Sequence, residues 1–110
     1  MVKLVCLLQR RPDVSRKEFH RWWTAEHIPL VRQFPGLRKY VVSLTTRSIL
    51  GGPDEWDGVA ELWFESEQAV DAAYAAAAGG TGKGDTEAHV GRVLRFVTEE
   101  IDVPVATGRS

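Results

Sequence analysis

The chain of 110 residues has few of the features that mark specialised classes of protein. It contains one cysteine, so it cannot form an internal disulfide. No apolar run approaches the roughly 18 residues that a membrane-spanning helix needs, and residues 1–9 are too short and mixed for a signal peptide. These absences argue against a disulfide-stapled domain and a membrane protein. We expect a cytoplasmic protein that folds as one domain over residues 1–110, with a loose tail over residues 103–110.

An excess of charge of one sign is also lacking. The chain has 14 basic and 15 acidic residues and a net charge of −1. Basic residues are concentrated in residues 1–47 and acidic residues in residues 48–110, with no linker between these halves. We therefore expect the halves to interleave and neutralise each other in one fold, and we expect no nucleic-acid partner.

The signatures of metal and phosphate binding are missing from the sequence. There is no C-x-x-C, and the three histidines at positions 20, 27 and 89 form no i,i+4 pair. The GGTGKG segment at 79–84 lacks the Ser or Thr that follows the lysine of a phosphate-binding loop. If the protein is an enzyme, we expect it to work by acid–base chemistry with no metal and no cofactor.

The pattern of apolar residues and turn signals predicts elements in the order β-α-β-β-α-β. Ser15 and Glu18 fit a capping box at the start of the first helix, and Pro29, which lacks an N–H, predicts a break around His27–Ile28. A short additional helix is predicted from Asp85 or Thr86 to about Leu94. The predicted strands are 2–9, 38–46, 57–64 and 96–103, and the second main helix is 67–78, ended by the glycines at 79–80.

This order is that of the ferredoxin-like α+β fold, in which helices cover one face of a four-stranded antiparallel sheet. The strand at 2–9 is apolar on both faces, so the other face of the sheet also needs a cover. At this length the chain has no spare segment for that purpose. We therefore expect a homodimer that packs sheet against sheet through the open face.

His27 is the first candidate for chemistry. It lies four residues after Trp23 on the apolar stripe of the helix, at the predicted break. A histidine in such a place could move protons near neutral pH, or it could be a hydrogen-bonded core residue that seals the break. His89, on a weakly defined segment near the expected mouth of the cleft, is a distant second candidate for proton transfer and is also expected to contact the substrate.

Two carboxylates are candidates for a second acid–base role. Alternation places Asp57, Val59, Glu61 and Trp63 on one face of a strand. Glu61 could orient His27 or exchange protons itself, and Asp57, at the strand end, is the weaker candidate. The alternative for both is a salt bridge to a basic residue such as Lys3 or Arg38.

Aromatic side chains are the candidates for holding a ligand. Tyr40 could donate a hydrogen bond to a ligand oxygen, although a half-buried strand tyrosine is common without such a role. Trp23 is a core residue by its spacing and could also form a wall for an aromatic ligand. Trp63 shares the strand face of Glu61 and is taken as a further substrate contact.

Three segments resemble the EthD family: S-R-K-E-F-H-R-W-W-T-A-E-H-I-P-L-V at 15–31, F-P-G-L-R-K-Y at 34–40 and W-D-G-V-A-E-L-W-F at 56–64. The resemblance implies a ferredoxin-like dimeric α/β barrel. Members of the family are implicated in ether-degradation clusters, lactone isomerisation and polyketide cyclisation or dehydration. Its recurring His, Asp and Glu positions fall on His27, Asp57 and Glu61, whereas the Gly-rich stretch at 79–92 departs from its usual pattern.

The resulting hypothesis is a cofactor-independent acid–base enzyme that acts on a small cyclic or aromatic metabolite. The reaction would be a polyketide-like cyclisation, a dehydration, or a lactone or enol isomerisation. Two alternatives remain open. One is a non-catalytic dimeric protein that binds a small molecule for a partner enzyme, and the other is a cofactor-free oxygenase of a phenol or quinol.

Overall fold

The computed structural model describes residues 1–51, 56–78 and 88–106. Four strands form one sheet in the order β2-β3-β1-β4, and each neighbouring pair is antiparallel. The strands are β1 (Val2–Arg10), β2 (Leu37–Leu44), β3 (Gly58–Phe64) and β4 (Val90–Thr98). This topology confirms the predicted ferredoxin-like α+β fold.

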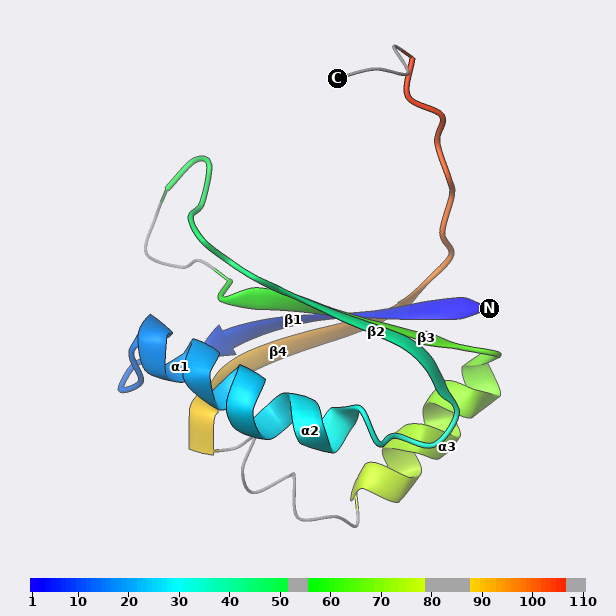
Figure 1. Ribbon diagram of the computed structural model, residues 1–110, viewed down its shortest axis with the longest axis horizontal. Coiled ribbons are helices and arrows are strands. Elements are labelled where there is room, and N and C mark those ends of the chain that lie inside the picture. Colours follow the sequence, from blue (N-terminus) through cyan, green and yellow to red (C-terminus); the bar gives the residue numbers. More distant parts are fainter. Residues whose placement is uncertain (52–55, 79–87, 107–110) are drawn as a thin grey trace.

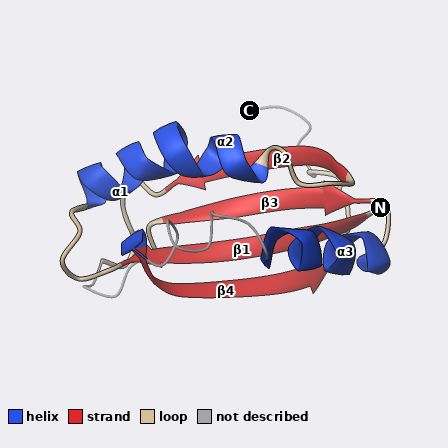
Figure 2. Cartoon of the chain, turned by 90° about the horizontal axis from the view of Figure 1, so that it is seen from below, coloured by secondary structure: helices blue, strands red, loops and turns tan. Residues whose placement is uncertain are grey.

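All the described helices lie on one face of the sheet (Figure 1). They are α1 (Arg16–Trp22), a π-helical segment η1 (Trp23–His27), α2 (Ile28–Val31) and α3 (Glu67–Ala78). Seen from the helix side, α1 and α2 run along the part of the sheet formed by β2, while α3 lies toward β1 and β4 (Figure 2). None of the helices in the described ranges is long and apolar enough to cross a membrane.

The first helical unit begins and breaks where the sequence predicts. The Ser15 hydroxyl accepts a hydrogen bond from the Glu18 backbone N–H, whereas the Glu18 carboxylate binds Arg21. Because Pro29 has no N–H to donate, the helical ladder cannot continue unchanged. The Ile28 N–H instead donates to the carbonyl of Trp23, five residues earlier, which is the hydrogen bond of a π-helix.

The core lies between the helices and the sheet. Alternate residues of β1 and β3 point to this side and are buried, and Phe19, Trp22 and Trp23 are fully buried against them. On the opposite face, Val5 and Leu7 of β1 are half-buried. The prediction that this strand is buried on both faces is therefore not met within a single chain.

The last strand differs from its predicted position. Instead of a helix to Leu94 and a strand at 96–103, β4 pairs with β1 along Val90–Thr98, and the described residues 88–89 just before it are helical. Pairing with the long strand β1 outweighs the weak helical preference of the segment. The predicted loop at 79–84 and the start of the short helix lie outside the described residues. Residues 99–106 form no regular element and leave the sheet on the side away from the helices (Figure 1).

Candidate functional site

A cavity of about 500 Å³ lies on the helix side of the sheet. Its volume is in the range of small-molecule sites. Most of its wall is aliphatic or aromatic, and every element except α1 contributes to it. The lining residues are Cys6, Leu8, Trp23, His27, Leu30, Val31, Phe34, Tyr40, Ala60, Leu62, Tyr74, Ala77, Val90, Gly91, Arg92, Val93 and Arg95.

The π-helical segment places His27 in the wall of this cavity. Its ring stacks on the buried Trp22 with 4.8 Å between ring centroids and 25° between planes. The stripe predicted from the sequence put His27 above Trp23, four residues earlier. The wider π turn brings it instead over Trp22, five residues earlier, and leaves Trp23 to line the cavity. The break is thus what positions this histidine.

Hydrogen-bond donors from β2 and η1 lie in the same cavity. Burial raises the pKa of Tyr40 to about 12, and the neighbouring Trp23 indole N–H offsets only part of this rise. Tyr40 therefore keeps its proton at neutral pH and can donate it to an acceptor. The Trp23 Nε1 is buried and has no acceptor within hydrogen-bond distance among the described residues. Both groups could serve the oxygen of a ligand.

A second polar group of the cavity was not predicted from the sequence. Cys6 Sγ lies 4.0 Å from the Tyr74 hydroxyl, and the Arg95 guanidinium lies 5.5 Å from the centroid of the Tyr74 ring. Burial raises the pKa of both Cys6 and Tyr74. In the sequence, Arg95 stands between Val93 and Val97 on one face of β4, and this alternation could have placed it on the cavity side. It becomes visible only when the strand is given its correct boundaries.

The structure does not bring Asp57 to His27. Asp57 is fully buried just before β3, where it accepts the Arg10 backbone N–H at 2.8 Å and pairs with the side chains of Arg10 and Arg16. Burial opposes its ionisation, but these hydrogen bonds outweigh it and hold the pKa of Asp57 below its ordinary value. Its carbonyl oxygen lies 2.9 Å from His20 Nε2. Asp57 is not in the cavity lining, and its contacts match the predicted salt-bridge alternative.

Glu61 and Trp63 point to the open face of the sheet, away from His27. Glu61 pairs with Lys3 at 2.9 Å, as the salt-bridge alternative predicts. The Trp63 indole N–H donates to Glu100 at 2.6 Å, and Lys39 lies 4.7 Å from the Trp63 ring centroid. The sheet therefore separates both residues from the cavity within one chain.

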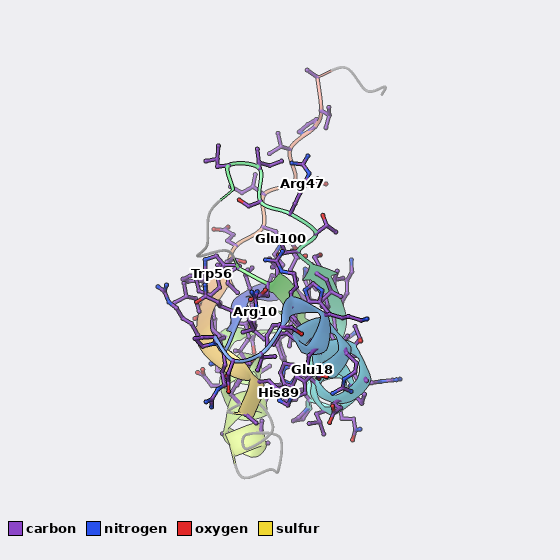
Figure 3. All side chains as sticks on the ribbon, turned by 90° about the vertical axis from the view of Figure 1, so that its left-hand side faces the viewer. Arg10, Glu18, Arg47, Trp56, His89 and Glu100 are labelled. Atoms are coloured by element: carbon purple, nitrogen blue, oxygen red, sulfur yellow. The ribbon has the colours of Figure 1, made fainter. Side chains whose placement is uncertain are left out.

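His89 lies at the entrance to β4, next to two residues of the cavity wall. Its ring stacks on Trp22 with 4.7 Å between centroids and 10° between planes, so His27 and His89 contact the same indole. Figure 3 shows His89 and Glu18 on the helix side of the sheet and Glu100 on the other side. Within the described ranges, no three His, Cys, Asp or Glu side chains are grouped so that they could hold a metal ion.

A model of the EthD domain matches residues 11–89, which include η1, β2 and β3. The chain belongs to the EthD family. An EthD-family protein of Bacillus halodurans has a similar structure, with a TM-score of 0.74 and 24% identity over 92% of this chain and 99% of that one. An uncharacterized 11.0 kDa protein from the thcB–thcC intergenic region of Rhodococcus erythropolis is 28% identical, over 78% of this chain and 84% of its own.

More distant structural neighbours show what else this fold carries. SnoaB of Streptomyces nogalater, a cofactor-independent oxygenase, has a TM-score of 0.59 and 15% identity, covering 93% of this chain and 94% of its own. A dimeric ferredoxin-like protein of unknown function from Thermobifida fusca has a TM-score of 0.63 and 10% identity, covering 88% of each chain. Structural neighbours of this EthD-family chain thus include a cofactor-independent enzyme and dimers of unknown function.

Proposed function

We propose that this EthD-family protein is a cofactor-independent acid–base enzyme acting on a small cyclic or aromatic metabolite, with His27 as the group that moves the proton. The observation that carries the proposal is the position of His27 in the wall of a largely apolar cavity. It is the residue of the described lining whose ordinary pKa lies near neutrality, and that lining contains no Asp or Glu.

The reaction that suits these groups is enolisation. His27 removes a proton from a carbon next to a carbonyl group, the electron pair of that C–H bond forms a C=C bond, and the π pair of the carbonyl group moves onto its oxygen. Tyr40 and the Trp23 indole N–H can donate hydrogen bonds to this oxygen as its negative charge develops. The enolate then takes back a proton, expels a leaving group or closes a ring, which corresponds to isomerisation, dehydration or cyclisation.

The two carboxylates that were candidates to orient His27 are engaged elsewhere. Because Glu61 lies on the open face and Asp57 at the strand end, neither is assigned to proton transfer. The Trp22 indole supports the face of the His27 imidazole instead. A general base needs an imidazole held in a fixed orientation, and the stacking on Trp22 provides this.

The test uses His27→Gln and the matched variant His20→Gln. His20 lies outside the cavity and contacts the Asp57 carbonyl, so its replacement controls for loss of a histidine on the same helical unit. Quinones, hydroxylated aromatics and lactones are screened first by thermal shift and then for turnover. We expect His27→Gln to reduce turnover by about 100- to 10,000-fold, the usual worth of a general acid–base group, while the protein stays folded.

Each other outcome has a definite meaning. A folded His27→Gln protein with undiminished turnover would remove His27 from the mechanism. A wild-type protein that binds a compound class tightly without converting it would favour the small-molecule binding protein. Oxygen uptake on addition of a dihydroxyaromatic would favour the cofactor-free oxygenase.

We also propose that the chain forms a homodimer through the open face of the sheet. This face carries apolar side chains of β1 and β4 that a single chain leaves partly exposed, including Phe96, which is 46% exposed. Residues 99–106 leave the sheet on the same side and expose Ile101, Val103 and Val105 (Figure 1). Burying these side chains against a second copy would remove apolar surface from water.

A further inference from the structure

Arg95 brings a positive charge to the edge of the cavity. It lies on the edge strand β4 opposite Cys6 of β1, so its side chain is on the helix side of the sheet. There its guanidinium approaches the ring of Tyr74 from α3. No carboxylate of the described residues forms a salt bridge with Arg95. Its polar neighbours among the described residues, Cys6 and Tyr74, are uncharged at neutral pH, so its five N–H donors face no anion of the described residues.

The other arginine of the lining has a different partner. The Arg92 guanidinium lies 5.1 Å from the centroid of the Trp56 ring, just before β3. Arg92 pairs in register with Gln9, whose side chain alternates with that of the buried Leu8, so the Arg92 side chain belongs to the opposite face of the sheet and only its backbone can border the cavity. Arg95 is therefore the guanidinium that serves the cavity, and Arg92 offers a control on the same strand.

The charge balance of the cavity favours an anion. The guanidinium of Arg95 borders the cavity, its described lining has no Asp or Glu, and Tyr40 and Tyr74 are neutral phenols whose pKa burial raises further above neutrality. A cationic group at the rim of a low-polarity pocket attracts an anionic ligand and gives it a fixed orientation.

We propose that the substrate is an apolar monoanion whose carboxylate is bound by Arg95 while its reacting carbonyl lies at His27 and Tyr40. This inference rests on the proposed function for the role of His27 but not for the role of Arg95. Tyr40 and Arg95 lie on the two opposite edge strands, β2 and β4. Both side chains act on Cys6 of the central strand β1 between them, so one ligand in the cavity can reach both groups.

The test compares an acid with its neutral counterpart. Binding of 2-naphthoate and 2-naphthamide, which share the apolar ring and differ in charge, is measured by calorimetry for wild type, Arg95→Gln, Arg92→Gln and His27→Gln. We expect wild type to bind the acid about tenfold more tightly than the amide, the effect of one charge-assisted hydrogen-bonded pair near solvent. Arg95→Gln should lose this preference and still bind the amide, whereas Arg92→Gln should keep the preference.

The outcomes separate this inference from the proposed function. Equal or undetectable binding of acid and amide by wild type would overturn the inference, as would a preference that survives in Arg95→Gln. Loss of the preference in Arg92→Gln as well would assign it to the general charge of the strand and overturn the specific role of Arg95. If His27→Gln keeps the preference but turnover is never found, the anion site stands and the proposed enzyme does not.

Discussion

The burial of Asp57 allows a quantitative test of whether this carboxylate is structural. Replacing Asp57 with Asn keeps the shape and one acceptor oxygen for the Arg10 backbone N–H but removes the charge that faces Arg10 and Arg16. Hydrogen bonds to charged groups contribute about 1.5–3 kcal/mol each, and breaking a fully buried pair costs about 3–5 kcal/mol. The two arginine side chains are 34% and 30% exposed, so water replaces part of the lost interaction. We expect a destabilisation of about 2–3 kcal/mol, or roughly 10 °C in Tm.

Urea unfolding at a fixed protein concentration measures this change, with Asp13→Asn as the control. Asp13 also pairs with an arginine, but its side chain is 71% exposed, and we expect its replacement to cost less than about 0.5 kcal/mol. The pH dependence gives a second check. Because the pKa of Asp57 is lowered on folding, its contribution is present above the unfolded pKa of about 3.9 and is lost as pH falls through the folded value. The stability difference between wild type and Asp57→Asn should therefore shrink below about pH 4. An Asp57→Asn protein of unchanged stability that has lost turnover would refute this reasoning and would indicate that Asp57 takes part in the reaction.

Two further predictions concern packing. Phe96→Glu puts a charge into the proposed interface, so it should convert a dimer to monomers in analytical ultracentrifugation. Val97 is equally exposed but lies on the helix side of the sheet, so Val97→Glu should leave the association unchanged. Dimers that persist in Phe96→Glu would exclude the open face as the interface. Gly58→Ala should destabilise the protein by about 1–3 kcal/mol and weaken ligand binding, because the added methyl group collides with the buried Trp23 ring. A Tm equal to that of wild type would show that the ring can move aside.

The parts of the fold that local chemistry dictates were predictable from the sequence. The Ser15 cap and the break before Pro29 each depend on residues within a few positions of one another. The position of β4 depends instead on pairing with β1, and the paired residues lie at least 80 positions apart in the chain. A strand defined by such a pairing is the element that a local pattern is least able to locate.

The error in β4 also explains what was missed in the site. With a strand at 96–103 and a helix before it, Arg95 has no defined face, whereas within β4 it shares a face with Val93 and Val97. Alternation correctly placed Glu61 and Trp63 on one face of β3, but it could not say which face the helices cover. That choice depends on the handedness with which the helices pack on the sheet, and it decides that Glu61 pairs with Lys3 rather than with His27.

The π-helical segment connects the sequence of this chain to its proposed chemistry most directly. In a regular α-helix, a residue five positions after Trp22 points about 140° away from it, so His27 could not stack on that indole. Pro29 disrupts the regular ladder, and the added residue in the turn brings His27 over Trp22 while Trp23 faces the cavity. Two consecutive tryptophans thereby acquire different roles, one supporting the imidazole and one forming the wall beside Tyr40. A π turn has poorer hydrogen-bond geometry than an α turn, so on folding grounds alone it is a disadvantage. This π turn lies at the histidine of the described cavity lining, so it supports the proposed role of His27.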